Sequence, residues 1–169
     1  MSAALLVMVV LPVILALAAG CDLTSYTIPN LLQLALVASF IVFALASGMS
    51  PVVVGLHVAA GIVGLIAGFT LFALGLVGGG DAKLFASVVL WLGLADLASY
   101  ALMASIMGGM LTLALLGLRT LPLPGQLMRF GWLVRLHDKK SGIPYGVALA
   151  AGALLLLPQT EIFRLAAGS

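Results

Sequence analysis

The chain turns polar at Gly78-Gly79-Gly80-Asp81-Ala82-Lys83, a glycine run that ends in an acid and, two residues later, a base. Apolar residues flank this stretch on both sides, over about 52–77 and about 84–95. As a helix, an apolar run of about 20 residues rises about 1.5 Å per residue and crosses a bilayer core of roughly 30 Å. We therefore expect the glycine run to separate two helices that are embedded in a membrane.

The composition of the whole chain supports the same interpretation. Its 169 residues are 64% hydrophobic and 7% charged, and the mean hydropathy is +1.33, whereas a soluble globular domain carries about 25% charged residues. We predict an all-α polytopic membrane protein, in which residues 1–169 form one domain, a bundle of six transmembrane helices. The predicted helices cover about 3–20, 30–47, 52–77, 82–95, 97–118 and 143–158, with a cytoplasmic loop over 119–142.

Charge and cysteine content exclude other classes of site. A net charge of +2 is too small to indicate nucleic acid as a partner, and the single cysteine, Cys21, excludes an intramolecular disulfide and a cysteine-based zinc cluster. The stretch Leu17–Cys21 resembles a lipoprotein processing site, but Met1-Ser2 lacks the Lys or Arg that opens a signal peptide. We expect the first helix to stay in the mature protein.

Two helices next to the glycine run have unusual features. The predicted helix over 82–95 has only fourteen residues, or about 21 Å, so either Asp81 or Asp96 must lie below the membrane surface. Irregular backbone at that depth is tolerated only where protein or a water-filled cavity covers it, which predicts a polar cavity at Asp81. In the preceding helix, Gly64 and Gly68 are spaced so that a neighbouring backbone can approach closely.

The basic residues indicate the orientation of the chain in the membrane. Six of the seven Lys and Arg residues fall after the first, third and fifth predicted helices, and Arg164 alone falls on the other side. Because Lys and Arg concentrate in cytoplasmic loops, we expect these three loops in the cytoplasm and both termini outside. Asp22 and Asp81 then both lie at cytoplasmic ends of helices.

Asp22 and Asp81 differ from the other three acids of the chain. Asp138 lies among basic residues, and Asp96 and Glu161 fall in outer turns, so these three are expected to be ordinary surface charges. Asp22 and Asp81 have apolar surroundings, and an ionisable group at a membrane helix suggests a functional site. Each could instead be a helix cap, and Asp81, after glycine and before Ala82, fits an N-cap position.

A pair of aspartates that approach closely has a defined chemistry. Two neighbouring carboxylates share one proton near the working pH, because both cannot ionise cheaply. The ionised member can take a proton from a water molecule that attacks a peptide carbonyl, while the protonated member donates to the developing oxyanion. The glycines before Asp81 would let a substrate backbone lie against it and permit a sharp break before the next helix.

Three motifs together resemble those of the type IV prepilin peptidases, membrane aspartic proteases of the GxGD class. The first is Asp22 followed by Ile28-Pro29-Asn30, the second is Gly78-x-Gly80-Asp81-x-Lys83-Leu84, and the third is Ile143-Pro144-Tyr145-Gly146-Val147-Ala148. The resemblance covers almost the whole chain. The length of the chain is similar to that of the short peptidases of tight-adherence (Flp) pilus systems.

The resemblance implies an intramembrane aspartic endopeptidase of the bacterial inner membrane, which cuts basic leader peptides from type IV prepilins or pseudopilins at the cytoplasmic face. It implies that Asp22 and Asp81 are catalytic and that no metal or cofactor is needed. Larger family members carry a methyltransferase segment with a four-cysteine zinc site, so with one cysteine we expect no N-methylation. Membrane lipid is the expected surrounding, and the supporting residues that the resemblance implies are Asn30, Gly78, Gly80, Lys83, Pro144, Tyr145 and Gly146.

Two other classes of function use the same acids differently. In a proton-coupled transporter or channel subunit, Asp22 and Asp81 would be relay sites in an aqueous path with access from both faces. In a non-catalytic scaffold of a pilus machine, changing either aspartate to asparagine would have no effect. The transporter is disfavoured because both acids fall at one face and the predicted helices over 30–47 and 97–118 contain no ionisable residue that could carry a proton across.

Overall fold

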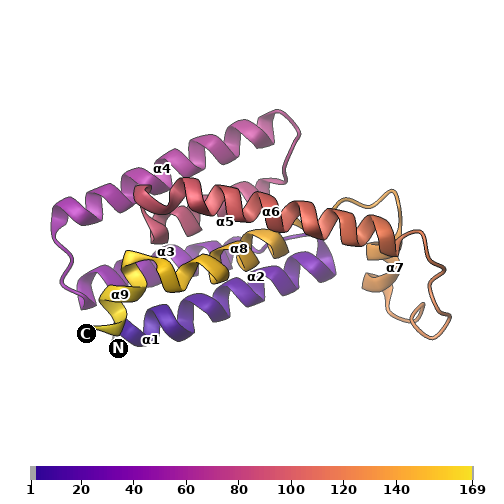
Figure 1. The fold of residues 1–169 in the computed structure, drawn as a ribbon, viewed down its shortest axis with the longest axis horizontal. Coiled ribbons are helices and arrows are strands. Elements are labelled where there is room, and N and C mark those ends of the chain that lie inside the picture. The colour runs from indigo at the N-terminus through magenta and orange to yellow at the C-terminus, as the bar shows by residue number, and fades with distance from the viewer. Residues whose placement is uncertain (1–2, 169) are drawn as a thin grey trace.

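The computed structural model describes residues 3–168, which form helices and connecting loops without a β-strand (Figure 1). The first helix is continuous from α1 (Ala3–Leu5) through a π-helical turn (Leu6–Val10) into α2 (Leu11–Ser25). The remaining elements are α3 (Asn30–Ala46), α4 (Pro51–Ala73), α5 (Gly79–Leu92), α6 (Leu94–Leu118), α7 (Gly131–His137), α8 (Tyr145–Leu156), a 3₁₀ turn (Leu157–Gln159) and α9 (Glu161–Ala167).

Three of these helices are long and apolar enough to cross a membrane. They are Ala3–Ser25, Pro51–Ala73 and Leu94–Leu118, and the pair Tyr145–Gln159 and Glu161–Ala167, bent by 57°, makes a fourth if it acts as one span. With 17 residues in α3 and 14 in α5, these two helices are shorter than a full span. The prediction of an all-α membrane protein is confirmed, and the number of six spans remains a prediction.

Several predicted boundaries differ from the structure. The first helix continues past residue 20 to Ser25, so Asp22 lies within a helix. The predicted helix 52–77 ends at Ala73, and the next begins at Gly79 instead of 82, so the break in the chain precedes the last two glycines of the run. Gly75, in this break, has a φ of 72°, which favours glycine.

Short helices also occupy segments predicted as irregular. The loop 119–142 contains α7, and the C-terminal tail contains α9, whose first turn is capped by the hydroxyl of Thr160. The helix predicted over 97–118 begins three residues earlier, at Leu94, and the helix predicted over 143–158 starts at Tyr145. A boundary read from hydropathy is least certain where polar capping residues extend a helix beyond its apolar run.

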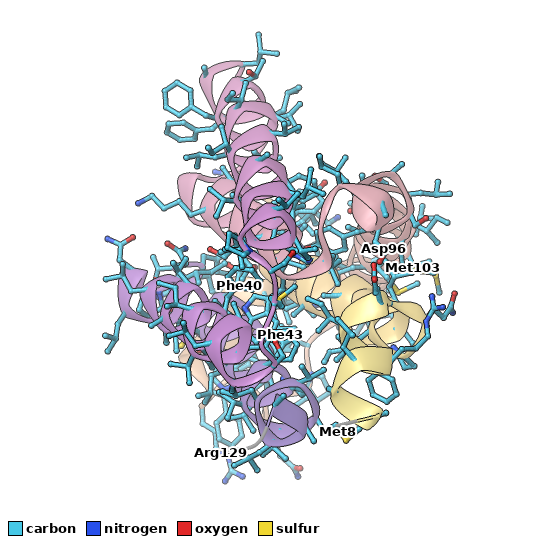
Figure 2. The ribbon with its side chains drawn as sticks, turned by 90° about the vertical axis from the view of Figure 1, so that its left-hand side faces the viewer. Met8, Phe40, Phe43, Asp96, Met103 and Arg129 are labelled. Atoms are coloured by element: carbon cyan, nitrogen blue, oxygen red, sulfur yellow. The ribbon has the colours of Figure 1, made fainter. Side chains whose placement is uncertain are left out.

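The helix α5 lies at the centre of the bundle and brings the other helices together. Its Trp91 is fully buried and donates its indole N–H to the carbonyl of Leu36 in α3 over 2.8 Å. The rings of Phe40 and Phe43 lie 5.7 and 5.4 Å from that of Trp91, and Figure 2 shows both phenylalanines inside the bundle. This cluster fixes α5 against α3.

On its other side α5 packs closely against α4. A Cβ added at Gly68 would lie 2.9 Å from the carbonyl oxygen of Ala82, and one at Gly64 would lie 3.2 Å from the Cα of Ala86. The predicted close approach of a neighbouring backbone is therefore confirmed, and the neighbour is α5. Since Ala82 follows Asp81 directly, this contact also holds the start of α5 in place.

Candidate active site

Asp22 lies in the last turn of α2 and is 5% exposed. Its Oδ2 accepts a hydrogen bond of 2.7 Å from the backbone N–H of Gly146, in the first turn of α8. A Cβ at Gly146 would lie 2.8 Å from that oxygen and 2.7 Å from the Cδ1 of Ile28. A side chain at position 146 would have to push the side chains of Asp22 and Ile28 aside, and the helix N-terminus of α8 favours a negative charge at Asp22.

Asp81 is the third residue of α5, and the N-cap of this helix is Gly78. The Oδ2 of Asp81 accepts the backbone N–H of Gly78 over 3.2 Å, as in a capping box. The prediction that Asp81 itself is the N-cap is thus wrong by three residues, because its side chain reaches back to the cap. Its carboxylate still lies at the positive end of the helix dipole.

The two acids line one cavity of about 230 Å³. Asp81 lies outside the long membrane helices, and burial and then the negative charge of Asp22 raise the pKa of Asp81 from its ordinary 3.8 to about 6. The negative charge of Asp22 thus acts on Asp81 at this cavity, and carboxyl groups that interact in this way titrate together. The cavity is lined by Asp22, Tyr26, Thr27, Ile28, Asn30, Gly78, Gly79, Gly80, Asp81 and Lys83.

Four of the predicted supporting residues lie at this cavity. Lys83 donates from its Nζ to the Oδ1 of Asn30 over 3.0 Å, which ties the start of α5 to the start of α3. Gly78 and Gly80 form part of the cavity wall, and the nearest side chain to Gly80 is that of Ile28. A Cβ at Gly80 would lie 3.5 Å from the Cβ of Ile28, an ordinary contact.

The third predicted motif reaches the site from α8. Pro144 is the N-cap residue of α8, and Gly146 donates to Asp22 as described. Tyr145 does not line the polar cavity and instead packs against Gly108 of α6, where a Cβ would lie 3.3 Å from its ring. Tyr145 and Asp81 together line a second cavity, which is apolar and has a volume of about 460 Å³.

Three further residues at or near the site were missed in the sequence. Gln33, 6% exposed, donates from Nε2 to the carbonyl of Gly80 over 3.1 Å, and its only signal was a polar residue within an apolar helix. Tyr26 has a left-handed backbone with a φ of 55°, and its hydroxyl is buried without a hydrogen-bond partner among residues 3–168. No local pattern in the sequence marked Tyr26.

Arg119 is the third missed residue, since its sequence context suggested only a basic loop. It is 6% exposed and donates from Nε to the carbonyl of Leu136 over 2.9 Å and from Nη2 to the carbonyl of Gly142 over 2.8 Å. Gly142 precedes Gly146 by four residues. Arg119 therefore anchors the segment that carries the amide donor of Asp22.

The chain was also compared with known proteins. The family model described as the type IV leader peptidase family matches residues 9–113, more than half of the chain. The chain belongs to the type IV leader peptidase family. The match includes both aspartates, Asn30 and the stretch 78–83, and it ends before the motif at 144–146. The chain matched no curated protein and no solved structure.

Membership of the type IV leader peptidases agrees with the arrangement of the cavity. The two acids are 59 positions apart in sequence, and both fall inside the matched part of the chain. In the described part of the chain, no group of three or more His, Cys, Asp or Glu residues gathers as metal ligands would. The cavity lining offers two carboxyl groups, the ammonium group of Lys83 and the hydroxyl groups of Tyr26 and Thr27.

Proposed function

We propose that this leader peptidase is an aspartic endopeptidase and that Asp22 and Asp81 are its catalytic pair. The observation that carries the proposal is that both carboxyl groups line one cavity, each accepting a backbone N–H of a helix N-terminus. The substrate is a type IV prepilin or pseudopilin with a basic leader and an apolar helix, cut at the cytoplasmic face of the bacterial inner membrane.

The geometry supports a division of roles between the two acids. The bond that Asp81 accepts from Gly78 is 3.2 Å long, against 2.7 Å for the bond that Asp22 accepts from Gly146, so the anionic form of Asp22 is held more closely. We therefore assign the shared proton to Asp81, whose pKa is raised to about 6 and which donates this proton to the carbonyl oxygen of the scissile bond. The ionised Asp22 takes a proton from a water molecule while the oxygen of that water bonds to the carbonyl carbon. When the C–N bond breaks, Asp22 gives that proton to the leaving nitrogen, and Asp81 regains one from the intermediate's hydroxyl.

The distribution of basic residues supports a cytoplasmic site. Lys83 and the five Lys and Arg residues of 119–142 lie on the side of the bundle at which both acids are found, whereas Arg164 lies in α9. By the positive-inside rule that side faces the cytoplasm, with both termini outside in a six-helix arrangement. We propose no N-methylation by this chain, which contains one cysteine.

The test uses Asp22→Asn and Asp81→Asn, which keep side-chain size and remove the ionisable group. Each variant should abolish cleavage of a co-expressed prepilin, measured as the loss of the processed band on an immunoblot. Asp138→Asn is the matched control, since Asp138 is exposed and its carboxylate accepts the backbone N–H of Lys140 in the same loop. Normal cleavage by either site variant, present in the membrane at the wild-type level, would show that the pair is not catalytic.

A further inference from the structure

Two apolar grooves flank α4. The α3–α4 groove, of about 670 Å³, is floored by α5 and has Asn30 and Lys83 in its lining. The α4–α6 groove, of about 460 Å³, is the second cavity described above and includes Asp81. Figure 1 shows that α4 diverges from α6 toward the C-terminal end of α4. From that end the short break leads into α5, whose first turn contains Asp81. The α4–α6 groove thus adjoins the polar cavity at Asp81, which lines both.

We propose that the α4–α6 groove binds the apolar helix of the substrate, on the C-terminal side of the bond that is cut. The inference rests on the proposed function, because it assumes that the peptide bond lies in the polar cavity between the two acids. Asp81 lines the polar cavity and the α4–α6 groove alike. A chain held at Asp81 therefore continues directly from the polar cavity into an apolar groove.

The walls of the groove suit a helix. The α6 wall presents Ala101, Ser105 and Gly109, which are four residues apart and lie on one face. A Cβ at Gly109 would meet no atom within 4 Å, so this part of the wall is open. On the opposite wall, α4 presents Val63, Ala67 and Leu71, while Gly68 is covered by its contact with Ala82. The small residues of the α6 wall let another helix approach closely, and close packing drives association where lipid surrounds the helices.

The length and polarity of the groove match an apolar segment. Its α6 wall extends from Leu97 to Gly109, thirteen residues whose ends are about 18 Å apart along the helix. Of the described residues that line the groove, only Asp81 has an acidic or basic side chain. In an apolar environment a peptide satisfies its own backbone groups as a helix, so the groove accommodates roughly twelve residues of a substrate helix.

The α3–α4 groove is the competing location for this helix. It is larger, but Asp81 does not line it, and the residues that it shares with the polar cavity are Asn30 and Lys83. These two side chains bond to each other and form a bridge between α3 and α5. A substrate helix in the α3–α4 groove would therefore enter the polar cavity past this bridge and away from Asp81.

Gly109→Trp fills the α4–α6 groove at its open wall, and Gly117→Trp is the matched control. Gly117 lies on α6 two turns further on, a Cβ added to it would meet no atom within 4 Å, and it lines neither groove. Purified proteins are assayed with a full prepilin and with a soluble peptide that contains the leader and the cut bond but lacks the apolar helix.

Gly109→Trp should raise the KM for the full prepilin about tenfold and leave cleavage of the soluble peptide unchanged, while Gly117→Trp changes neither. No effect on the full prepilin, or an equal loss on both substrates, would overturn the inference. If the wild-type protein cleaves neither substrate, the proposed function itself fails.

Photo-cross-linking locates the substrate helix directly. The substrate carries a photo-reactive residue in its apolar helix, and the Asp81→Asn protein is used so that the bound substrate is not cleaved. Cross-links should form with α6, and Gly109→Trp should abolish them, whereas Leu34→Trp, on the α3 wall of the other groove, should not. Cross-links confined to α3, or cross-links to α6 that persist in Gly109→Trp, would exclude the α4–α6 groove as the binding site.

Discussion

Asp22 and Asp81 are the same residue type at opposite kinds of helix end. Asp81 lies in the first turn of α5, where the helix dipole favours a carboxylate, and it accepts the N–H of Gly78, three residues earlier. Asp22 lies in the last turn of α2, where the dipole disfavours a negative charge, and it accepts the N–H of Gly146, 124 residues later. Asp81 is held by its own helix, and Asp22 by a different one.

The difference shows how two unlike local structures produce similar surroundings. At Asp81 the helix N-terminus is supplied by the glycine run next to it. At Asp22 it is supplied by α8, which packs against α2 so closely that a Cβ at position 146 would meet the side chains of Asp22 and Ile28. We therefore expect a substitution in α8, which is far from Asp22 in the sequence, to disturb Asp22 more than a substitution in the neighbouring glycine run disturbs Asp81.

Gly146→Ala should have the largest effect. The added Cβ would lie 2.8 Å from the Oδ2 and 3.0 Å from the Cβ of Asp22, so α8 or the Asp22 side chain must shift. Because a displacement of about 1 Å can cost about 10²-fold in rate, we expect a loss of that size in prepilin cleavage by the purified protein. Gly142→Ala, where a Cβ meets no atom within 4 Å, should keep full activity. A near-normal rate for Gly146→Ala would contradict the account of Asp22.

The pH dependence of cleavage tests the sharing of one proton. Because the pKa of Asp81 is raised to about 6, Asp81 keeps its proton below that pH and loses it above. Activity that requires the singly protonated pair should then fall about tenfold per pH unit above about pH 6. The kcat of purified protein, measured between pH 5 and 8, checks this, and a flat profile to pH 8 would show that Asp81 is not the proton donor.

Arg119→Ala tests whether the donor of Asp22 depends on the loop before α8. Without the guanidinium, the carbonyls of Leu136 and Gly142 lose their bonds, and the segment that leads to Gly146 is released. We expect roughly a tenfold loss of kcat, since a positioning residue is removed and the carboxyl groups remain. Arg119→Lys, which cannot bond both carbonyls with fork geometry, should recover only part of the rate. Equal rates for wild type and Arg119→Ala would exclude this role.

Gly78→Ala should have a smaller effect than Gly146→Ala or Arg119→Ala. The added Cβ would lie 2.9 Å from the Oδ2 of Asp81, the end of a side chain that can rotate, and the backbone at Gly78 has an extended conformation open to any residue. We expect less than a tenfold loss in cleavage rate, and a smaller one for Gly80→Ala. A loss for Gly78→Ala as large as that for Gly146→Ala would remove the distinction between the two acids.

The sequence predicted part of this site well. The apolar runs predicted helices within a few residues, and the motifs at Asp22, Asp81 and Gly146 all mark residues at or beside the polar cavity. The bridge between Asn30 and Lys83 could not be foreseen, although both residues were expected to support the site. Its partners come from different helices, and the distance between them depends on how α3 and α5 pack.

The sequence by itself determined that the chain is helical and membrane-embedded, because hydropathy and helix length follow from residue type alone. It also determined the bond from the Gly78 N–H to the Asp81 carboxylate, because both residues lie within one helical turn. The tertiary structure alone decided that Asp22 receives an amide donor, that Arg119 anchors the segment bearing it, and that two grooves flank α4. These features depend on contacts between helices far apart in the chain, and local patterns carry no record of such distances.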